Sequence, residues 1–418
     1  MAVDASGGSL TRAAYRQAVT NQRQSCFPCL PPASHVSDNI TPTATPAPKP
    51  SAAGQRFLFI DALKALGSQF IVLHHLAFYG PMSDWTHSLA PDLVEWFSRD
   101  ARMAVQVFLV VAGFLAARSL APDGVLRTTT PGRALWQRYV RIGLPYLAAL
   151  VVAMLCNELA RLWMNHDTVS EPPTAWQFLA HALMIQSLTG VDSLSAGVWY
   201  VAIDLQLFAL LLLLLWAVRS AVPGRLGWQP RAARLAVTLV VLASFFHFNR
   251  DAEWDNWALY FFGAYGLGVL TAWASAPEQT DTARWLWWGV VMAAMLALAV
   301  DYRERLVLAL MVAGLLAWSL RDGWFYHWPQ SRILAYLGRI SYSVFLLNFP
   351  VALVVNAWFT RFASPDPVVQ TLGVVLAWLA CNAAGAVFHH AVEEPLSRLG
   401  RSRREAQGRS RTLLGLRP

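Results

Sequence analysis

Long apolar runs, each of a length that can cross a membrane, alternate with short polar segments over most of this 418-residue sequence. A spanning helix needs about 20 predominantly apolar residues. Because a bilayer offers backbone groups no hydrogen-bond partners, such runs must fold as helices. We therefore expect an all-α fold, a polytopic membrane helix bundle with about ten transmembrane helices. The predicted spans are 57–80, 102–120, 141–161, 198–218, 232–249, 257–275, 285–301, 304–320, 333–358 and 368–393.

The composition excludes a soluble multidomain protein and a largely disordered chain. Hydrophobic residues make up 56% of the sequence and charged residues only 14%, against about 25% charged in a typical soluble domain. The net charge of +8 is explained by basic cytoplasmic loops, so we expect no nucleic-acid partner. The one C-x-x-C motif, Cys26 to Cys29, has no second pair to complete a zinc site, and no metal is expected.

The distribution of basic residues predicts the orientation of the chain. With the N-terminus inside, 24 of the 33 Lys and Arg residues fall in inside segments and 7 in outside loops, the bias typical of cytoplasmic loops. Residues 1–55 are predicted to be a flexible cytoplasmic tail, residues 56–398 the transmembrane domain, and residues 399–418 a basic cytoplasmic tail. Residues 174–188 are too short and polar for a span and predict an interfacial or re-entrant helix.

The first predicted span carries ionisable residues, each of which costs about 2.5–3.5 kcal/mol at a membrane centre. Asp61 and Lys64 are i,i+3 neighbours and can pair. Lys64 and His75 are eleven residues apart, which places them on one helix face about 16 Å apart along the axis. His74 points about 100° away. Lys64 and His75 are therefore candidate functional residues; the alternative is a basic anchor plus a histidine bonded to a neighbouring helix.

Ionisable residues also occur in later spans. Arg138 and Arg141 are i,i+3 at the entrance of the third span and can face one ligand, and guanidinium groups suit phosphates. Asp204 lies in a leucine-rich span and needs a partner, either as a structural partner of a buried basic residue or in an acid–base relay. His390 and Glu393 have the spacing of half a di-metal site, but the sequence lacks the other half, so Glu393 is predicted to be an ion-pair member.

Six motifs follow one another in the sequence between Arg56 and Arg398. They are Asp61 with Lys64 and His75; 104-AVQVFLVVAGFLAARSL-120 with Gln106; Arg138-x-x-Arg141; Trp199 to Phe208 with Asp204; 338-GRISYSVFLLNFPV-351 with Tyr342 and Asn348; and Glu393-Glu394-Pro395. In this order they resemble the membrane-bound acyltransferase family 3, integral-membrane O-acyltransferases that act on cell-surface glycans. Gln106, Asp204 and Asn348 depart from the residues usual in that family, which are an acid, Glu and His.

The resemblance implies an acyl-CoA donor, usually acetyl-CoA, with no permanently bound cofactor. It implies a glycan or lipid-linked sugar as acceptor, and a multi-pass protein surrounded by lipid in the bacterial inner membrane. Lys64 and His75 would be the essential catalytic residues, with Asp61 or Asp204 supporting them. Arg138 and Arg141 would bind the donor. The residues expected to bind substrate are Trp199, Tyr342 and Asn348.

These expectations combine into a mechanism. Arg138 and Arg141 would hold the CoA phosphates and Lys64 would guide the donor into the bundle. His75 would act as general base on the acceptor hydroxyl or first take the acyl group itself. The alternative function is a transporter or acyl conduit that uses a proton-coupled pair of His75 and Asp204 without catalysing transfer. The sequence leaves the oligomeric state open.

Overall fold

The computed structural model of the protein describes residues 57–222, 227–276 and 281–398. Within these ranges all regular secondary structure is helical, and no strand is present. The predicted all-α class is confirmed. The predicted tails, 1–55 and 399–418, lie outside the described residues.

Each of the ten predicted spans coincides with a helix. The match follows from length, because an apolar run of this size can satisfy its backbone groups only within itself. The helices are α2 (Leu58–Phe78), α5 (Val105–Leu120), α6 (Pro131–Trp163), α9 (Val198–Ala221), α10 (Gln229–Phe246), α11 (Ala258–Ala274), α12 (Asp281–Val300), α13 (Glu304–Arg321), α14 (Arg332–Phe362) and α15 (Pro367–Phe388).

Seven helical stretches of the described chain are long and apolar enough to cross a membrane, and the apolar helix α11 is shorter. Helices α2 and α13 are not among the seven; both carry charged residues, including Lys64 in α2 and Arg305 in α13. A polytopic helix bundle is thus confirmed, while the number of ten spans and the cytoplasmic termini remain predictions. Residues 174–188 hold only the short helices α7 (Ala175–Ala182) and α8 (Gln186–Thr189).

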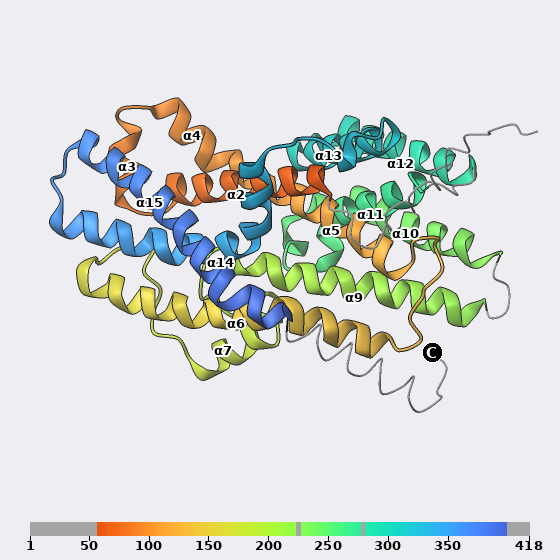
Figure 1. Ribbon diagram of the computed structural model, residues 1–418, viewed down its shortest axis with the longest axis horizontal. Coiled ribbons are helices and arrows are strands. Elements are labelled where there is room, and N and C mark those ends of the chain that lie inside the picture. Colours follow the sequence, from red (N-terminus) through yellow and green to blue (C-terminus); the bar gives the residue numbers. More distant parts are fainter. Residues whose placement is uncertain (1–56, 223–226, 277–280, 399–418) are drawn as a thin grey trace, which may run out of the picture. The chain divides into compact units, whose positions relative to one another are not determined.

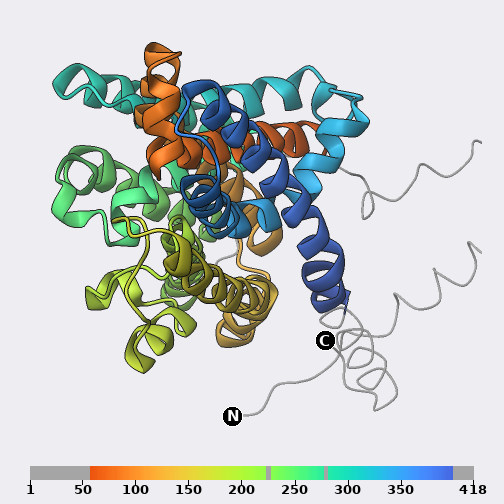
Figure 2. The same cartoon turned by 90° about the vertical axis from the view of Figure 1, so that its left-hand side faces the viewer.

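The long helices run in roughly one direction and its reverse (Figure 1). Helix α14 packs against α2, α15 and α6, and α11 packs against α5, α10, α13 and α9. The short helices α3 (Pro81–His87) and α4 (Pro91–Arg99) follow α2 and lie at one end of the bundle. Figure 2 shows this end from the front. The arrangement brings residues from α2, α6, α9, α11 and α14 into one interior region.

Glycines allow two pairs of helices to touch through their backbones. A Cβ atom at Gly113 of α5 would lie 1.9 Å from the carbonyl oxygen of Tyr265 in α11, and one at Gly268 would lie 1.9 Å from that of Val110. A Cβ at Gly338 of α14 would lie 2.1 Å from the carbonyl oxygen of Asp61 in α2. Small residues permit this close approach in membrane bundles.

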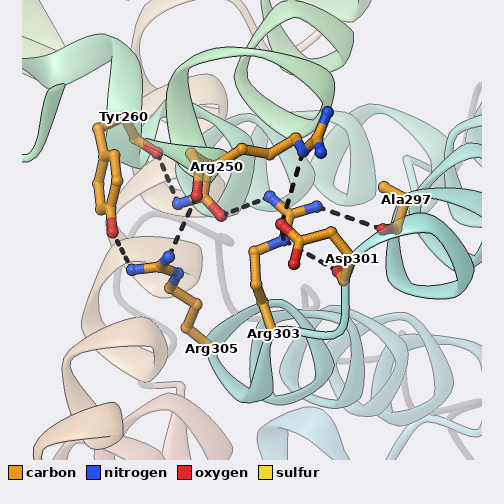
Figure 3. A network of polar contacts seen from close by, with 7 residues as sticks. Arg250, Tyr260, Ala297, Asp301, Arg303 and Arg305 are labelled. Atoms are coloured by element: carbon orange, nitrogen blue, oxygen red, sulfur yellow. Dashed lines mark hydrogen bonds and ion pairs between the residues drawn. The ribbon is translucent and has the colours of Figure 1, made fainter. Parts of the chain in front are cut away.

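Arginine side chains form a network of polar contacts at the turn between α12 and α13 (Figure 3). The buried Arg303 donates from Nη1 to the side-chain oxygen of Asn249 at 3.0 Å and lies 3.5 Å from Asp301. Arg305 donates to the Tyr260 hydroxyl and, at 3.1 Å, to the Asn249 carbonyl oxygen. Burial lowers the pKa of the Arg303 guanidinium. These bonds satisfy the buried cation and fix the turn to α11.

Substituting Gly113→Ala tests the contact between α5 and α11. The added methyl group must push the helices apart, so we expect a loss of about 1–3 kcal/mol in the free energy of unfolding. Thermal unfolding of the purified protein in detergent measures the change. The matched control is Gly314→Ala in α13, where a Cβ meets no atom within 4 Å and helix propensity predicts a gain of about 0.5–1 kcal/mol. Equal melting temperatures for the two variants would contradict the packing described.

Candidate active site

Helices α2 and α14 bring a histidine and an asparagine together in the interior of the bundle. His75 is 6% exposed and Asn348 is 1% exposed. The Nδ1 atom of His75 is hydrogen-bonded to the Oδ1 atom of Asn348. The Nδ2 atom of Asn348 donates to the carbonyl oxygens of Val344, at 3.2 Å, and Phe345, at 2.7 Å.

This network assigns the proton on the His75 ring. The amide nitrogen of Asn348 is used on two carbonyl groups, so the atom that faces the imidazole is the amide oxygen, which accepts. Nδ1 of His75 must then be the donor, and the neutral ring keeps its lone pair on Nε2. A neutral imidazole held in this tautomer can act through Nε2 as a base or a nucleophile.

Aromatic rings and a glycine surround the His75 ring. The centroids of the Tyr79 and Phe349 rings lie 5.6 and 6.1 Å from its centroid. Gly197, which precedes α9, has a left-handed backbone with φ +85°, and a Cβ there would lie 3.4 Å from Cε1 of His75. Three helices, α2, α9 and α14, therefore converge on this imidazole.

A second polar pair joins α6 to α9. The Nη2 atom of Arg138 lies 2.6 Å from Oδ2 of Asp204, and its guanidinium lies 5.4 Å from the centre of the Phe208 ring. Asp204 is 6% exposed. Of the two roles predicted for Asp204, the structure supports that of a partner for a basic residue. In this structure Nδ1 of His75 is bonded to Asn348 and Asp204 to Arg138, so that support of His75 by Asp61 or Asp204 stays a prediction.

The two arginines of the R-x-x-R motif differ in their surroundings. Arg138 is half-buried and turned toward Asp204, whereas Arg141 is exposed. Near them, the Tyr342 hydroxyl donates to the carbonyl oxygen of Ile142 at 2.7 Å. A ligand shared by the two arginines would therefore meet Arg138 paired with Asp204 in the interior and Arg141 at the surface.

Of the remaining predicted site residues, Asp61 and Lys64 lie apart from His75. Asp61 and Lys64 are half-buried near the start of α2, about three helical turns from His75. Trp199 is half-buried, with its ring centroid 5.5 Å from that of Phe261. Asn348 was expected to bind substrate, but its side chain is already used by His75 and by its own helix.

Helix α9 connects the two polar pairs. Gly197 beside His75 and Asp204 beside Arg138 are seven residues apart, a rise of about 10 Å along the helix. Between them, the Tyr200 ring lies 5.4 Å from the Phe345 ring, centroid to centroid. The candidate active site thus extends through the interior of the bundle from Arg138 and Asp204 to the imidazole of His75.

A cleft of about 540 Å³ lies at the end of α2 that carries His75. It lies between α2, α3 and α4, and Ala77 and Phe78, the second and third residues after His75, line it. The remaining lining is largely polar. It consists of Ser83, Asp84, His87, Val94, Glu95 and Ser98.

The predicted ion-pair role of Glu393 is supported. Its Oε2 atom accepts from the Ser343 hydroxyl at 2.6 Å and lies 2.9 Å from Nδ1 of His389. The ligand atoms of His389, His390 and Glu394 lie within 4.8 Å of one another, but Glu394 is held by Arg398 at 2.7 Å. The five-residue π-helix η6 (His389–Glu393) places these side chains, and the helix continues past Pro395.

Two residues of this region were not predicted. Gly197 directly precedes a predicted span, and a glycine at a helix start is common for purely structural reasons. Tyr265 lies in the all-apolar run of α11, where a tyrosine ring packs like any other aromatic residue. Only the electrostatic influence of Arg138 and Asp204 on its hydroxyl distinguishes it.

The variant Asn348→Leu tests the assignment of the His75 tautomer. Leucine removes the acceptor for Nδ1, and an unpaired buried N–H costs about 1–3 kcal/mol. We expect nitrogen NMR of histidine-labelled protein to show the Nδ1–H tautomer of His75 in the native protein and a mixture of tautomers in the variant. The same tautomer populations in both proteins would rule out Asn348 as the residue that positions the ring.

The comparisons with known proteins agree with this arrangement. Residues 57–386 match the protein family described as acyltransferase domain, family 3. No curated protein and no solved structure matches the chain significantly. The match covers α2 through most of α15 and includes His75, the arginine pair, Asp204 and Asn348. Because the matched region is much more than half of the sequence, this chain belongs to acyltransferase family 3, the membrane-embedded acyltransferases.

Proposed function

We propose that this membrane acyltransferase transfers an acyl group, most simply acetyl, from cytoplasmic acyl-CoA to a hydroxyl of a cell-envelope glycan or lipid-linked sugar. The observation that carries the proposal is the buried His75, whose Nδ1 atom is bound by Asn348 and whose Nε2 atom is left for chemistry. An ionisable residue inside a membrane bundle is a functional candidate, because its burial is costly.

The proposed reaction is a direct transfer. As the acceptor oxygen attacks the thioester carbonyl carbon, its proton moves to Nε2 of His75. The tetrahedral intermediate then collapses and the carbon–sulfur bond breaks. The leaving thiolate takes the proton back from the imidazolium, so that the products are an ester and the thiol of CoA. Asn348 holds the ring in one tautomer throughout.

The donor would enter from the end of the bundle that the charge distribution predicts to be cytoplasmic. Arg141 is exposed there, while Arg138 is tied to Asp204. We therefore expect Arg141 to make the larger contribution to binding the CoA phosphates, with Arg138 meeting the donor deeper in the bundle. Lys64, on the same helix as His75, would complete the basic entrance.

The acceptor would approach from the opposite end. The cleft between α2, α3 and α4 begins within one turn of His75 and offers carboxylate and hydroxyl groups, Asp84, Glu95 and Ser98 among them. Such groups suit the hydroxyls of a sugar, because carboxylates accept hydrogen bonds and serine hydroxyls both accept and donate them. In this arrangement the two substrates reach His75 from different sides of the membrane.

The alternative of a transporter or conduit with a proton-coupled pair of His75 and Asp204 is less well supported. The two residues bond to different partners, Asn348 and Arg138. A proton relay between them would have to break both interactions. The experiment below separates the two functions, since a conduit alone produces no ester.

The variant His75→Ala tests the function directly. We expect it to lose transfer from labelled acetyl-CoA to isolated envelope glycans by about 10²–10⁴-fold, the contribution of a general base. Mass spectrometry of the glycan detects the ester. The control His74→Ala changes the neighbouring side chain, which is bonded at Nδ1 to the Phe97 carbonyl oxygen, and should keep transfer. Normal transfer by the His75→Ala protein would refute the mechanism.

The variant Arg141→Ala tests the donor side. We expect the KM for acetyl-CoA to rise about tenfold, because a charge-assisted bond to phosphate is lost. The KM for acetyl-pantetheine, which lacks the nucleotide phosphates, should not change. The control is Arg361→Ala at the C-terminal end of α14, also exposed, which should leave both values unchanged. An equal rise for both donors would exclude phosphate binding by Arg141.

A further inference from the structure

Two atoms of the ion pair between Arg138 and Asp204 are buried and find no hydrogen-bond partner in the described chain, and the same holds for a third atom on a residue within electrostatic range of the pair. They are Nε of Arg138, Oδ1 of Asp204 and the hydroxyl of Tyr265. Tyr265 has no exposed surface and lies within electrostatic range of both members of the pair. Buried polar groups are nearly always satisfied, so three such atoms on residues within electrostatic range of one another indicate a missing polar partner.

The three atoms define the chemistry of that partner. Nε of Arg138 donates, Oδ1 of Asp204 accepts, and the Tyr265 hydroxyl, which can do either, is available as a second donor. A secondary amide matches this set, since its carbonyl oxygen accepts two hydrogen bonds and its N–H donates one. A hydroxyl group can also accept two hydrogen bonds and donate one. An amide is favoured because the three atoms lie on the side of His75 from which the acyl-CoA donor would enter.

The spacing along two helices agrees with a particular amide. Asp204 lies about 10 Å along α9 from Gly197, which touches His75, and Tyr342, near Arg138, lies about 9 Å along α14 from Asn348. The arm of CoA contains two amides. In an extended arm, the second amide nitrogen is about 10 Å from the thioester carbon, at about 1.25 Å per bond. A thioester placed at His75 would therefore put its second amide beside Asp204.

We propose that Arg138, Asp204 and Tyr265 form a binding site for the second amide of the donor's pantetheine arm, the one further from the sulfur. This proposal rests on the proposed acyl-CoA donor and names how that donor is positioned. The carbonyl oxygen of the amide accepts from Arg138 and Tyr265, and its N–H donates to Asp204. Because the arm between the second amide and the thioester has a fixed extended length, binding of the amide at this site places the thioester at His75.

The variant Tyr265→Phe tests the site, because the hydroxyl has no hydrogen-bond partner among the residues that the structure describes. Equilibrium binding to purified protein in lipid nanodiscs is measured by calorimetry with CoA, pantetheine and adenosine 3′,5′-bisphosphate. We expect the variant to bind CoA and pantetheine about 3- to 10-fold more weakly, as for one lost hydrogen bond. Its affinity for the bisphosphate and its melting temperature should not fall.

Two controls distinguish this from a general loss of structure. Tyr146 is equally buried, but its hydroxyl accepts from Nε2 of Gln186 at 3.4 Å, so Tyr146→Phe should keep the affinity for pantetheine. Arg141→Ala should weaken CoA and the bisphosphate but not pantetheine. For the native protein, a pantetheine analogue with an ester oxygen in place of the second amide N–H should bind more weakly than pantetheine.

Unchanged pantetheine binding by the Tyr265→Phe protein, or equal binding of the ester analogue by the native protein, would overturn the site. A fall in melting temperature would also overturn it, since the hydroxyl would then have a partner within the protein. These outcomes are independent of catalysis. Pantetheine binding that depends on Tyr265, without any acyl transfer, would refute the proposed function and leave the binding site in place.

Discussion

The hydrogen bond between His75 and Asn348 is the interaction on which the candidate site depends. It joins α2 to α14, and it leaves Nε2 as the basic atom of a ring that is otherwise enclosed. The bond requires the Asn348 amide to be fixed, and two carbonyl groups of its own helix fix it. In the apolar interior of a bundle, a buried imidazole N–H needs such an acceptor. The same hydrogen bond thus satisfies the buried Nδ1–H of His75 and leaves Nε2 as the atom that can act as a base.

Buried polar groups in this protein fall into two kinds. Glu393 is bonded to Ser343 and His389, and Arg303 to Asn249 and Asp301; each set is complete and holds helices together. The atoms around Arg138 and Asp204 are incomplete. Within this pair, incomplete bonding together with buried charge marks Arg138 and Asp204 as candidate binding groups.

The sequence predicts the helices better than it predicts their contacts. Spans appear as apolar runs, and the cost of burying Asp204 indicates that a partner exists. That partner is 66 residues away in the chain, and Asn348 is 273 residues from His75, so no periodicity connects them. Family resemblance marked Asn348 as a departure from histidine but not as the residue that orients His75. Tyr265 could not be found from sequence, because a hydroxyl without a partner is a property of the folded interior.

The arginine network around Arg303 and the cleft beside α2 lie at turns between different helices. The two turns differ in how many side-chain bonds hold them. The turn between α12 and α13 is cross-linked by several guanidinium bonds to α11 and to Asn249 (Figure 3). Helices α3 and α4 are short and border open volume. On the proposed function, a movement that admits the glycan acceptor should therefore occur at α3 and α4, while the arginine-bonded turn between α12 and α13 stays in place. Lipids that crowd α3 and α4 would then slow the entry of the acceptor without touching the donor.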